Sequence, residues 1–358
     1  MKTYQKKNLK RFLIKLAIFM CLSALVFASL FFSQPIESVL NNTQFFVSDL
    51  FLSSKFSVHY IDVGQGDCSF IKVDDKTIMI DCGTADSAKN IIRYLNNLGL
   101  SKNSKIDYLI LTHADLDHVG GACDLLDYYN FENIYRPKLY SNYEVDNNLN
   151  LHNYNVNKSK LWSMVVEKVL NETDNNFYCF DKQQFSGDNF KFSFYSPFED
   201  ALKNDNDYSP IMVLESFDKK FMFTGDASIE VENEFLSNYL TEAKQGYFDC
   251  DVLKVGHHGS EDSTSNLFLD MVNPEVCVIS CGLDNIYGHP SNRVIDDISN
   301  CNGKIMRTDT MGSIIVYENN GILGLKSGVN YITSIYFEWW MFVICIEVVL
   351  AFALFIKI

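Results

Sequence analysis

The segment at residues 112–121 constrains this chain more than any other part of the sequence, because potential metal ligands crowd together directly after an apolar run, YLIL. Those ligands are His113, Asp115, Asp117 and His118. Side chains alternate along an extended backbone, so the first three are expected on one side and His118 on another. Charges that merely contact solvent on a loop do not explain this alternation of imidazoles and carboxylates. The segment therefore predicts a site for two adjacent metal ions.

Three other apolar runs also lead to side chains of the kind that bind metals. The runs IMI, FMF and LKV lead to Asp81, Asp226 and the pair His257–His258, respectively. A single Gly-Asp turn carries little information, but the repetition of polar residues after expected strands forms a pattern. Loops at strand ends commonly carry functional side chains. We therefore expect a metal centre built from loops at one edge of a sheet.

Apolar runs of strand length alternate with helix-like stretches through the body of the chain, which predicts an α/β fold. Strands are expected at residues 57–63, 69–73, 77–81, 107–112, 190–195, 211–217, 220–224, 251–255, 275–280, 304–307 and 313–317. Helices are expected at residues 87–98, 121–129, 158–170, 229–239, 266–271 and 293–301. The segment at 140–184 is rich in Asn and Asp, and we expect a surface insertion with one helix there.

Charge is distributed unevenly along the chain. The sequence has 30 basic and 45 acidic residues, a formal net charge of −15, yet its first 15 residues hold six cations and no acid. The remainder therefore carries 24 basic and 45 acidic side chains, and so acidic a body repels polyanions. This composition excludes a protein that binds nucleic acid through bulk charge. The sequence contains no CxxC pair, so a thiolate zinc cage has no support.

Both ends of the chain are expected to lie in the cell membrane. Residues 16–32 form an uncharged apolar run behind the basic N-terminus, and residues 339–356 form a second run that contains Glu347. Such lengths approach those of bilayer-spanning helices, and the cations favour a cytoplasmic N-terminus. A cleaved signal peptide and a buried helix are the respective alternatives. The expected organisation is a transmembrane segment within 1–35, an extracytoplasmic domain at 55–328 and a second transmembrane segment at 336–358.

Taken in order, the motifs of the body resemble those of the metallo-β-lactamase superfamily and, more closely, the hydrolase domain of ComEC-type competence proteins. The resemblance covers roughly residues 55–325 and rests on the segments DVGQGD (62–67), IDCG (80–83), HADLDH (113–118), FTGD (223–226), GHHGS (256–260), YGHP (287–290) and RTD (307–309). The fold that it implies is a four-layer αββα sandwich with metal ions at the edge of the sheets.

The resemblance also implies roles for individual residues. Six would bind metal: His113 and Asp115 the first ion, Asp117, His118 and His257 the second, and Asp226 both ions. Two would support the ligands from behind or contact substrate: Asp81 and His258.

This sequence departs from the common superfamily pattern HxHxDH, because Asp115 replaces the middle histidine. A further histidine for the first ion is not evident, since His59 lies inside an expected strand, where simple packing is the better interpretation. The first site is therefore rich in oxygen ligands, which favours Mn²⁺ beside or instead of Zn²⁺. One to two such ions are expected.

The expected activity is metal-dependent hydrolysis by a membrane-anchored enzyme. A bound ion lowers the pKa of its water and supplies hydroxide at neutral pH, and two ions can clamp the attacking and leaving oxygens of a phosphodiester. Asp117, Asp226 and His289 are expected to be catalytic. His289 would contact a phosphate oxygen or protonate the leaving group, with an ordinary turn histidine as the alternative. A phosphodiesterase or nuclease is the first interpretation, although the acidic charge disfavours nucleic acid.

Two other functions stay open at this point. One is a hydrolase of a lactone, ester or lactam on the same metals, and the other is a non-catalytic binding domain, which the nearly complete ligand set disfavours. Competence proteins of this type carry a large multi-helix channel, whereas this chain offers two spans at most, so we expect a tethered hydrolase without a pore. The expected partners are a phosphodiester or small-molecule substrate and the membrane, and no obligate protein partner is inferred.

Overall fold

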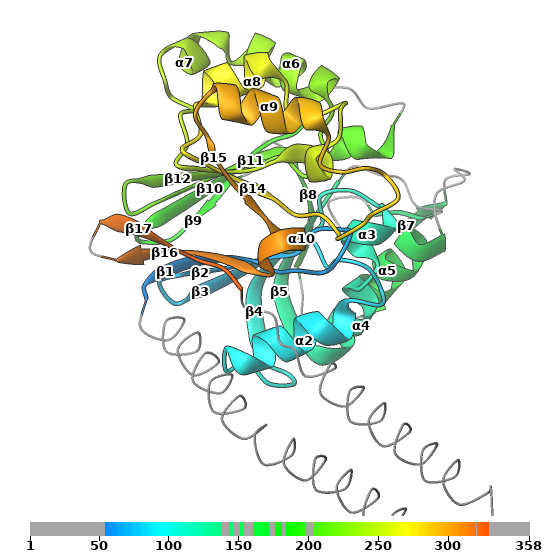
Figure 1. The fold of residues 1–358 in the computed structure, drawn as a ribbon. Coiled ribbons are helices and arrows are strands. Elements are labelled where there is room, and N and C mark those ends of the chain that lie inside the picture. The colour runs from blue at the N-terminus through cyan, green and yellow to red at the C-terminus, as the bar shows by residue number, and fades with distance from the viewer. Residues whose placement is uncertain are drawn as a thin grey trace, which may run out of the picture. The chain divides into compact units, whose positions relative to one another are not determined.

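The computed structural model describes residues 54–137, 143–145, 151–153, 160–171, 176–180, 184–197, 204–319 and 321–328 (Figure 1). The expected transmembrane segments, at 1–35 and 336–358, lie outside these residues. Among the residues that are described, no helix combines the length and the apolar character needed to cross a membrane.

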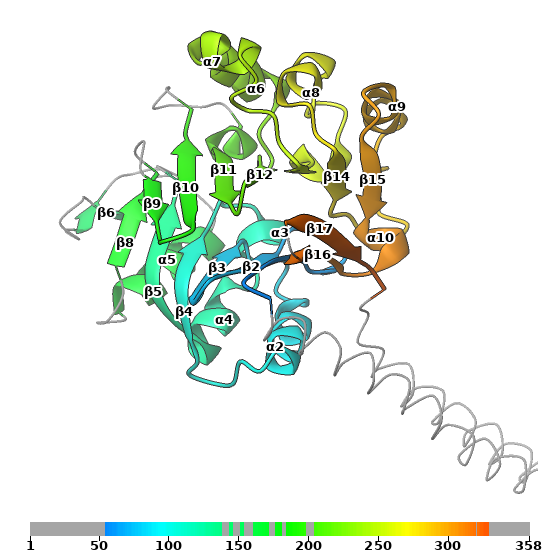
Figure 2. The same ribbon diagram turned by 90° about the vertical axis from the view of Figure 1, so that its left-hand side faces the viewer.

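Two large β-sheets face each other in the described part of the chain (Figure 1, Figure 2). In spatial order, the first sheet contains β17 (Ile322–Lys326), β16 (Ile314–Asn319), β1 (Phe56–Tyr60), β2 (Ser69–Val73), β3 (Lys76–Ile80), β4 (Lys105–Ile110), β5 (Asn130–Arg136) and β8 (Asn176–Cys179). The second contains β15 (Lys304–Arg307), β14 (Val276–Ile279), β13 (Val252–Lys254), β12 (Lys219–Phe223), β11 (Ile211–Ser216), β10 (Phe190–Tyr195) and β9 (Gln184–Ser186). A separate hairpin pairs β6 (Tyr143–Val145) with β7 (Leu151–Asn153).

Helices cover the outer face of each sheet, which gives the layer order helix, sheet, sheet, helix (Figure 1). On the side of the first sheet lie α2 (Ala88–Asn97), α3 (Leu116–Val119), α4 (Ala122–Tyr128) and α5 (Lys160–Asn171). On the side of the second lie α6 (Ile229–Asn238), α7 (Leu240–Lys244), α8 (Asn266–Val272) and α9 (Asn292–Asn300). The remaining short helices are η1 (Asp205–Tyr208), η2 (Gly256–Gly259) and α10 (Thr308–Met311). The expected four-layer αββα sandwich is confirmed.

The main core lies between the two sheets and follows from the two-residue alternation of the strands. In β1, Phe56, Val58 and Tyr60 join the core between the sheets, while the intervening His59 contacts Tyr94 of α2 on the outer face. The facing sheet contributes, among others, the alternate phenylalanines of β10, Phe190, Phe192 and Phe194. Burying so many large apolar side chains is the main stabilising term for the sandwich.

A second apolar cluster forms where the helices pack on the outer face of the second sheet. Helix α9 has the amphipathic spacing expected of a surface helix, and it buries Val294 and Ile298 against Cys277 and Ile279 of β14. The side chain of Ser291 caps this helix by accepting a hydrogen bond from the backbone N–H of Val294. The outer helices are therefore part of the fold rather than appendages.

The expectation of a mere surface insertion at 140–184 is wrong in part. The one predicted helix is present as α5, but its apolar face, with Trp162 and Val165 buried, packs as part of the helical layer of the first sheet. The strand β8 then extends that sheet beside β5. The short sequence NFYC shows too little alternation to predict a strand, and pairing with an existing sheet edge supplies what the local pattern lacks.

The strands that precede the predicted site residues end at the same edge of the sandwich. Strands β3 and β4 are parallel in the first sheet, and β12, β13 and β14 are parallel in the second, so the loops after them emerge together. Gly225 permits the close approach of these loops, because a Cβ there would lie 2.9 Å from Ser209 and 3.1 Å from Thr112. Its φ of +52° also favours glycine. The expected convergence of strand-end loops is thus confirmed.

Candidate metal centre

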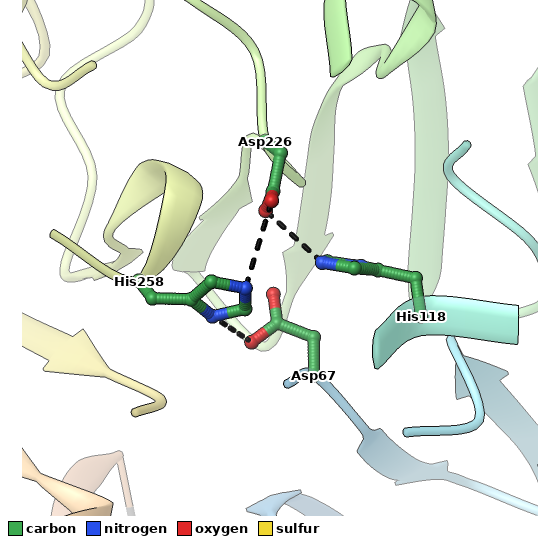
Figure 3. Close-up of side chains that lie close together, drawn as sticks. All are labelled: Asp67, His118, Asp226 and His258. Carbon is green, nitrogen blue, oxygen red and sulfur yellow. Dashed lines mark ion pairs between the residues drawn. The ribbon is translucent and has the colours of Figure 1, made fainter. Parts of the chain in front are cut away.

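Four buried side chains from four separate segments meet where these loops converge (Figure 3). Asp67 belongs to the loop between β1 and β2, His118 to α3, Asp226 to the loop after β12, and His258 to η2. One potential ligand atom from each lies within 4.8 Å of the others. We call these four residues the central group. Because two come from each half of the sandwich, the group exists only when both sheets are in place.

Contacts within the central group place nitrogen and oxygen atoms face to face. The Nε2 atom of His118 lies 3.2 Å from Oδ1 of Asp226, and Nε2 of His258 lies 3.6 Å from Oδ2 of the same carboxylate. On its other side, Nδ1 of His258 lies 3.5 Å from Oδ1 of Asp67 (Figure 3). Asp226 is therefore the side chain that joins the two imidazoles.

The potential metal-ligand atoms of this region fit a metal ion, because several of them are buried and have no hydrogen-bond partner among the described residues. They are Oδ1 of Asp67, Nε2 of His113, Nε2 of His118, Oδ1 of Asp226 and Nε2 of His258. Buried polar atoms almost always find a partner, so a cluster of exceptions calls for an explanation. Imidazole and carboxylate are the ligand types that Zn²⁺ and Mn²⁺ accept.

The tautomers of the two central imidazoles are fixed from behind. Nδ1 of His118 lies 2.7 Å from Oδ2 of Asp81, and Nδ1 of His258 lies 2.9 Å from the backbone carbonyl of Ser280. A carbonyl or a carboxylate accepts, so each Nδ1 carries the hydrogen and donates it. When the ring is neutral, each Nε2 then has its lone pair toward the central group, which is the arrangement that metal-binding histidines use.

Asp81 is held in this supporting position by the chain itself. The backbone N–H and the hydroxyl of Thr112 both donate to its carboxylate, at 2.8 Å and 2.7 Å. Asp81 therefore lies directly behind the ring of His118.

Further predicted ligands also lie around Asp226. Nε2 of His113 lies 3.8 Å from Oδ2 of Asp226 and also 3.8 Å from Oδ2 of Asp115. Nε2 of His257 lies 3.7 Å from Oδ2 of Asp226 and 3.2 Å from Nδ2 of Asn206. Asp226 therefore lies among four imidazole nitrogens, with Oδ1 nearest His118 and Oδ2 nearest His113, His257 and His258.

The sequence segment 61–282 matches the family model described as "Metallo-beta-lactamase superfamily". The chain belongs to this superfamily. Among curated proteins, ComE operon protein 3 of Bacillus subtilis is 29% identical over 281 residues, covering 74% of this chain and 33% of that protein. Competence protein ComA of Neisseria gonorrhoeae is 27% identical over 256 residues, covering 71% and 31%.

Recombination protein 2 of Haemophilus influenzae is 27% identical over 267 residues and covers 73% of this chain and 29% of that protein. The chain thus spans about a third of the length of the curated relatives that it matches. The resemblance to competence proteins expected from the motifs is confirmed. Together with the buried His/Asp group, the superfamily fold supports a metal-dependent hydrolase, with a divalent ion as its cofactor.

Two expectations about the metallo-β-lactamase motifs differ from the structure. The first is that residues 113–117 are extended, whereas α3 begins at Leu116, so Asp117 and His118 lie on a helical turn. The second concerns the histidine pair, for which the resemblance implies that His257 binds metal and that His258 supports the ligands or contacts substrate. The structure places His258 in the central group, with Nε2 3.2 Å from Oδ2 of Asp117, while Nε2 of the more exposed His257 lies 3.7 Å from Oδ2 of Asp226.

The backbone conformation of the histidine pair explains the positions of these two side chains. His257 and His258 both have positive φ, 44° and 54°, which is unfavourable for residues with a side chain. The turn directs His258 inward, while Nδ1 of His257 pairs with Oδ1 of Asp262 at 3.0 Å. A sequence pattern that counts only strands and helices does not reveal such a turn.

Sequence reasoning missed the contribution of Asp67. Nζ of Lys254 lies 2.7 Å from Oδ2 of Asp67, and both side chains are almost fully buried. The lysine also donates to the backbone carbonyl of Val255 at 2.8 Å. Gly66 brings the Asp67 loop against α3, because a Cβ on it would lie 2.4 Å from the backbone oxygen of Asp117. The signal was present in the sequence as a lysine inside the otherwise apolar run LKV.

Charge is balanced internally at the centre. Burial lowers the pKa of His118, but attraction to Asp226 and Asp81 outweighs it and raises that pKa well above the ordinary value. The same competition raises the pKa of His258 to about 10, whereas burial together with the nearby His118 lowers the pKa of His113 to about 3. Without metal, protons on two imidazoles offset the carboxylates, so metal binding must displace protons.

His289 lies beside the histidine pair, at the mouth of the site. Its ring centroid is 5.5 Å from that of His257 and 6.3 Å from that of His258. Its backbone N–H donates to Oδ1 of Asn285, and its buried Nδ1 has no hydrogen-bond partner among the described residues. Burial, with the nearby His257 and His258, lowers its pKa. His289 therefore presents a neutral ring to whatever lies over the centre.

Proposed function

We propose that this metallo-β-lactamase domain is a metal-dependent phosphodiesterase. The observation that carries the proposal is the position of Asp226 among four imidazole nitrogens, that of His118 beside Oδ1 and those of His113, His257 and His258 beside Oδ2, which is more nitrogen than one ion shares with a carboxylate. Two ions that share a carboxylate suit the in-line displacement at a phosphodiester, because both the attacking and the leaving oxygen need stabilisation. The similarity to competence proteins supports the same choice.

Bound Zn²⁺ or Mn²⁺ would supply Lewis acidity and an activated water at this position. The chain itself supplies orientation: Asp81 and the Ser280 carbonyl fix the rings of His118 and His258 through their Nδ1 hydrogens. The Asp117 side chain is 29% exposed and reaches His258, and its carboxylate would accept a proton at the solvent side. His289 would contact a phosphate oxygen or the leaving group.

The proposal is tested by incubating the purified protein with Mn²⁺ or Zn²⁺ and with bis-p-nitrophenyl phosphate, single-stranded DNA, RNA, and a lactone. Phosphodiester cleavage that disappears with a chelator and returns more fully with Mn²⁺ than with Mg²⁺ is the expected result, because the imidazoles favour a transition ion. A metal-loaded protein that opens the lactone but cleaves none of the phosphodiesters refutes the proposal and favours the hydrolase of a lactone, ester or lactam.

We also propose that the domain is held at the membrane and faces the outside, on the basis of the apolar runs at 16–32 and 339–356 and the basic N-terminus. A protease added to intact cells should then cut the domain and leave the N-terminal segment protected. A reporter fused after Gln34 that is active only in the cytosol would refute this orientation.

A further inference from the structure

Beside the metal centre, the loop at 282–290 exposes large apolar side chains that the catalytic geometry does not use. Ile286 is 92% exposed, Tyr287 64% and Leu283 70%. Exposed apolar side chains are common singly, but a group on one loop beside a site marks a contact surface. Tyr287 is the aromatic member of this group.

The ring of Tyr287 continues a series of rings that begins at the metal centre. Its centroid lies 5.7 Å from that of His289 with an interplanar angle of 26°, and His289 is in turn stacked on His258 at 6.3 Å with an angle of 27°. Tyr287 thus lies one ring beyond His289, and most of its side chain is open to solvent. A planar group attached to a phosphate at the centre could lie on that face.

The loop that carries Tyr287 is fixed at both ends. The side chain of Asn285 donates to the carbonyls of Gly282 and His289 and accepts from the His289 backbone N–H. The backbone N–H of Gly282 donates to Oε1 of Gln65, which ties the loop to the segment that carries Asp67. A stacking surface held this way loses little conformational entropy when a ligand binds.

Charge around the centre limits what else holds a substrate. The segments 61–68, 111–121, 204–210, 224–228, 254–265 and 281–293, which form the centre and its surroundings, contain two basic residues and ten acidic ones. Both cations are already engaged, Lys254 with Asp67 and Arg293 with Asp297 and backbone carbonyls. Recognition of a long or double-stranded nucleic acid needs cations along the phosphates, which these segments do not offer.

We propose that Tyr287 is a stacking site for a nucleobase, and that the substrate is a short single-stranded nucleotide chain held by one base and one metal-bound phosphate. This inference rests on the proposed phosphodiesterase function and specifies its substrate. Aromatic stacking suits the acidic surroundings, because it requires no charge and accepts any base. The metals meet the charge of the reacting phosphate, and the remaining phosphates stay in solvent.

The test compares pentathymidylate with a strand of equal length in which tetrahydrofuran residues replace the nucleosides. Affinities of the full chain are measured by anisotropy in Ca²⁺, and KM and kcat are measured in Mn²⁺. The wild type should prefer pentathymidylate by at least ~5-fold, in line with about 1–3 kcal/mol per stacked base. The substitution Tyr287→Ala should bring this preference close to one, Tyr287→Phe should keep it, and the control Tyr247→Ala, at an exposed tyrosine of the α7–β13 loop, should leave it unchanged.

Salt provides an independent measurement. One bound phosphate predicts a slope of log affinity against log salt of about −0.7, whereas a strand held by several cations gives a much steeper slope. A steep slope, an equal affinity for the two strands, or an unaltered preference in Tyr287→Ala overturns the proposal. Equal cleavage of both strands would reject the base-stacking site but support the phosphodiesterase function. Binding that depends on the bases, without any cleavage, would support the stacking site but reject the phosphodiesterase function.

Discussion

Replacing Asp226 by asparagine tests the centre most directly, because the change keeps the shape of the side chain and removes its charge. The carboxylate is 2% exposed, and its two oxygens lie 3.2 Å from Nε2 of His118, 3.6 Å from that of His258 and 3.8 Å from that of His113. Water has little access to such a position, so nothing replaces the lost ligand. We expect weaker metal binding and much slower turnover in Asp226→Asn.

The size of the effect follows from the number of ligand atoms that Asp226 contacts. Losing a residue that merely supports a ligand typically costs 10- to 100-fold in metal affinity or activity. Asp226 faces four imidazole nitrogens directly, so we expect at least ~100-fold losses in metal affinity and in kcat. Such a loss in kcat corresponds to about 2.7 kcal/mol of transition-state stabilisation.

Metal affinity is measured by titration of the chelator-treated protein, kcat with the phosphodiester that the wild type cleaves best, and folding by urea denaturation. Asp107→Asn serves as a matched control. Asp107 is also a buried carboxylate, but it pairs with Lys76 and Lys105 at the beginning of β4, at the end of that strand opposite the centre. The control should lose stability, by about 1–3 kcal/mol, and keep its metal. Wild-type metal affinity in Asp226→Asn would show that the ions bind elsewhere.

Three further changes probe other parts of the structure. His258→Ala should lower metal affinity at least ~10-fold more than His257→Ala in the same titration; the reverse order would restore the role predicted from sequence. Lys254→Met should destabilise the fold by about 3–5 kcal/mol in urea, because it leaves the Asp67 carboxylate buried without its partner, and an unchanged midpoint would contradict the buried pair. Burial, with the nearby Lys72, lowers the pKa of His59 from 6.5 to about 3, so the unfolded chain binds the extra proton between these values and stability falls as pH falls. Urea denaturation at pH 6.5 and 5 should show that His59→Gln loses less unfolding free energy than the wild type, by up to about 1.4 kcal/mol per pH unit. An equal loss in the two proteins would contradict the role of His59.

Much of the fold could be predicted from the sequence because its strands are short apolar runs that end in polar side chains. That pattern located the loops after β3, β4, β12 and β13, and parallel pairing brings such loops to one edge. The strand β8 was missed because its sequence is poor in alternation and it depends on pairing with β5. Local sequence carries no information about a partner strand that arrives from elsewhere in the chain.

Within the centre, the sequence located His118 and Asp226 but not the inward residue of the pair His257–His258. The choice depends on two consecutive left-handed residues, a conformation that sequence patterns do not predict for histidine. Asp67 was missed for a different reason. Its carboxylate becomes relevant only because Lys254, far away in sequence, neutralises it in the interior, and such a pair is visible only in three dimensions.

The division of the central group between the two sheets has a consequence for how the protein unfolds. Asp67 and His118 belong to the half that builds the first sheet, and Asp226 and His258 to the half that builds the second. An ion bound by all four acts as a cross-link between segments distant in the chain, and closing such long loops restricts the denatured ensemble. The loaded protein should therefore unfold as one cooperative unit, whereas the metal-free protein should first open along the seam between the sheets. Amide hydrogens near that edge would then exchange faster than those of the strand centres.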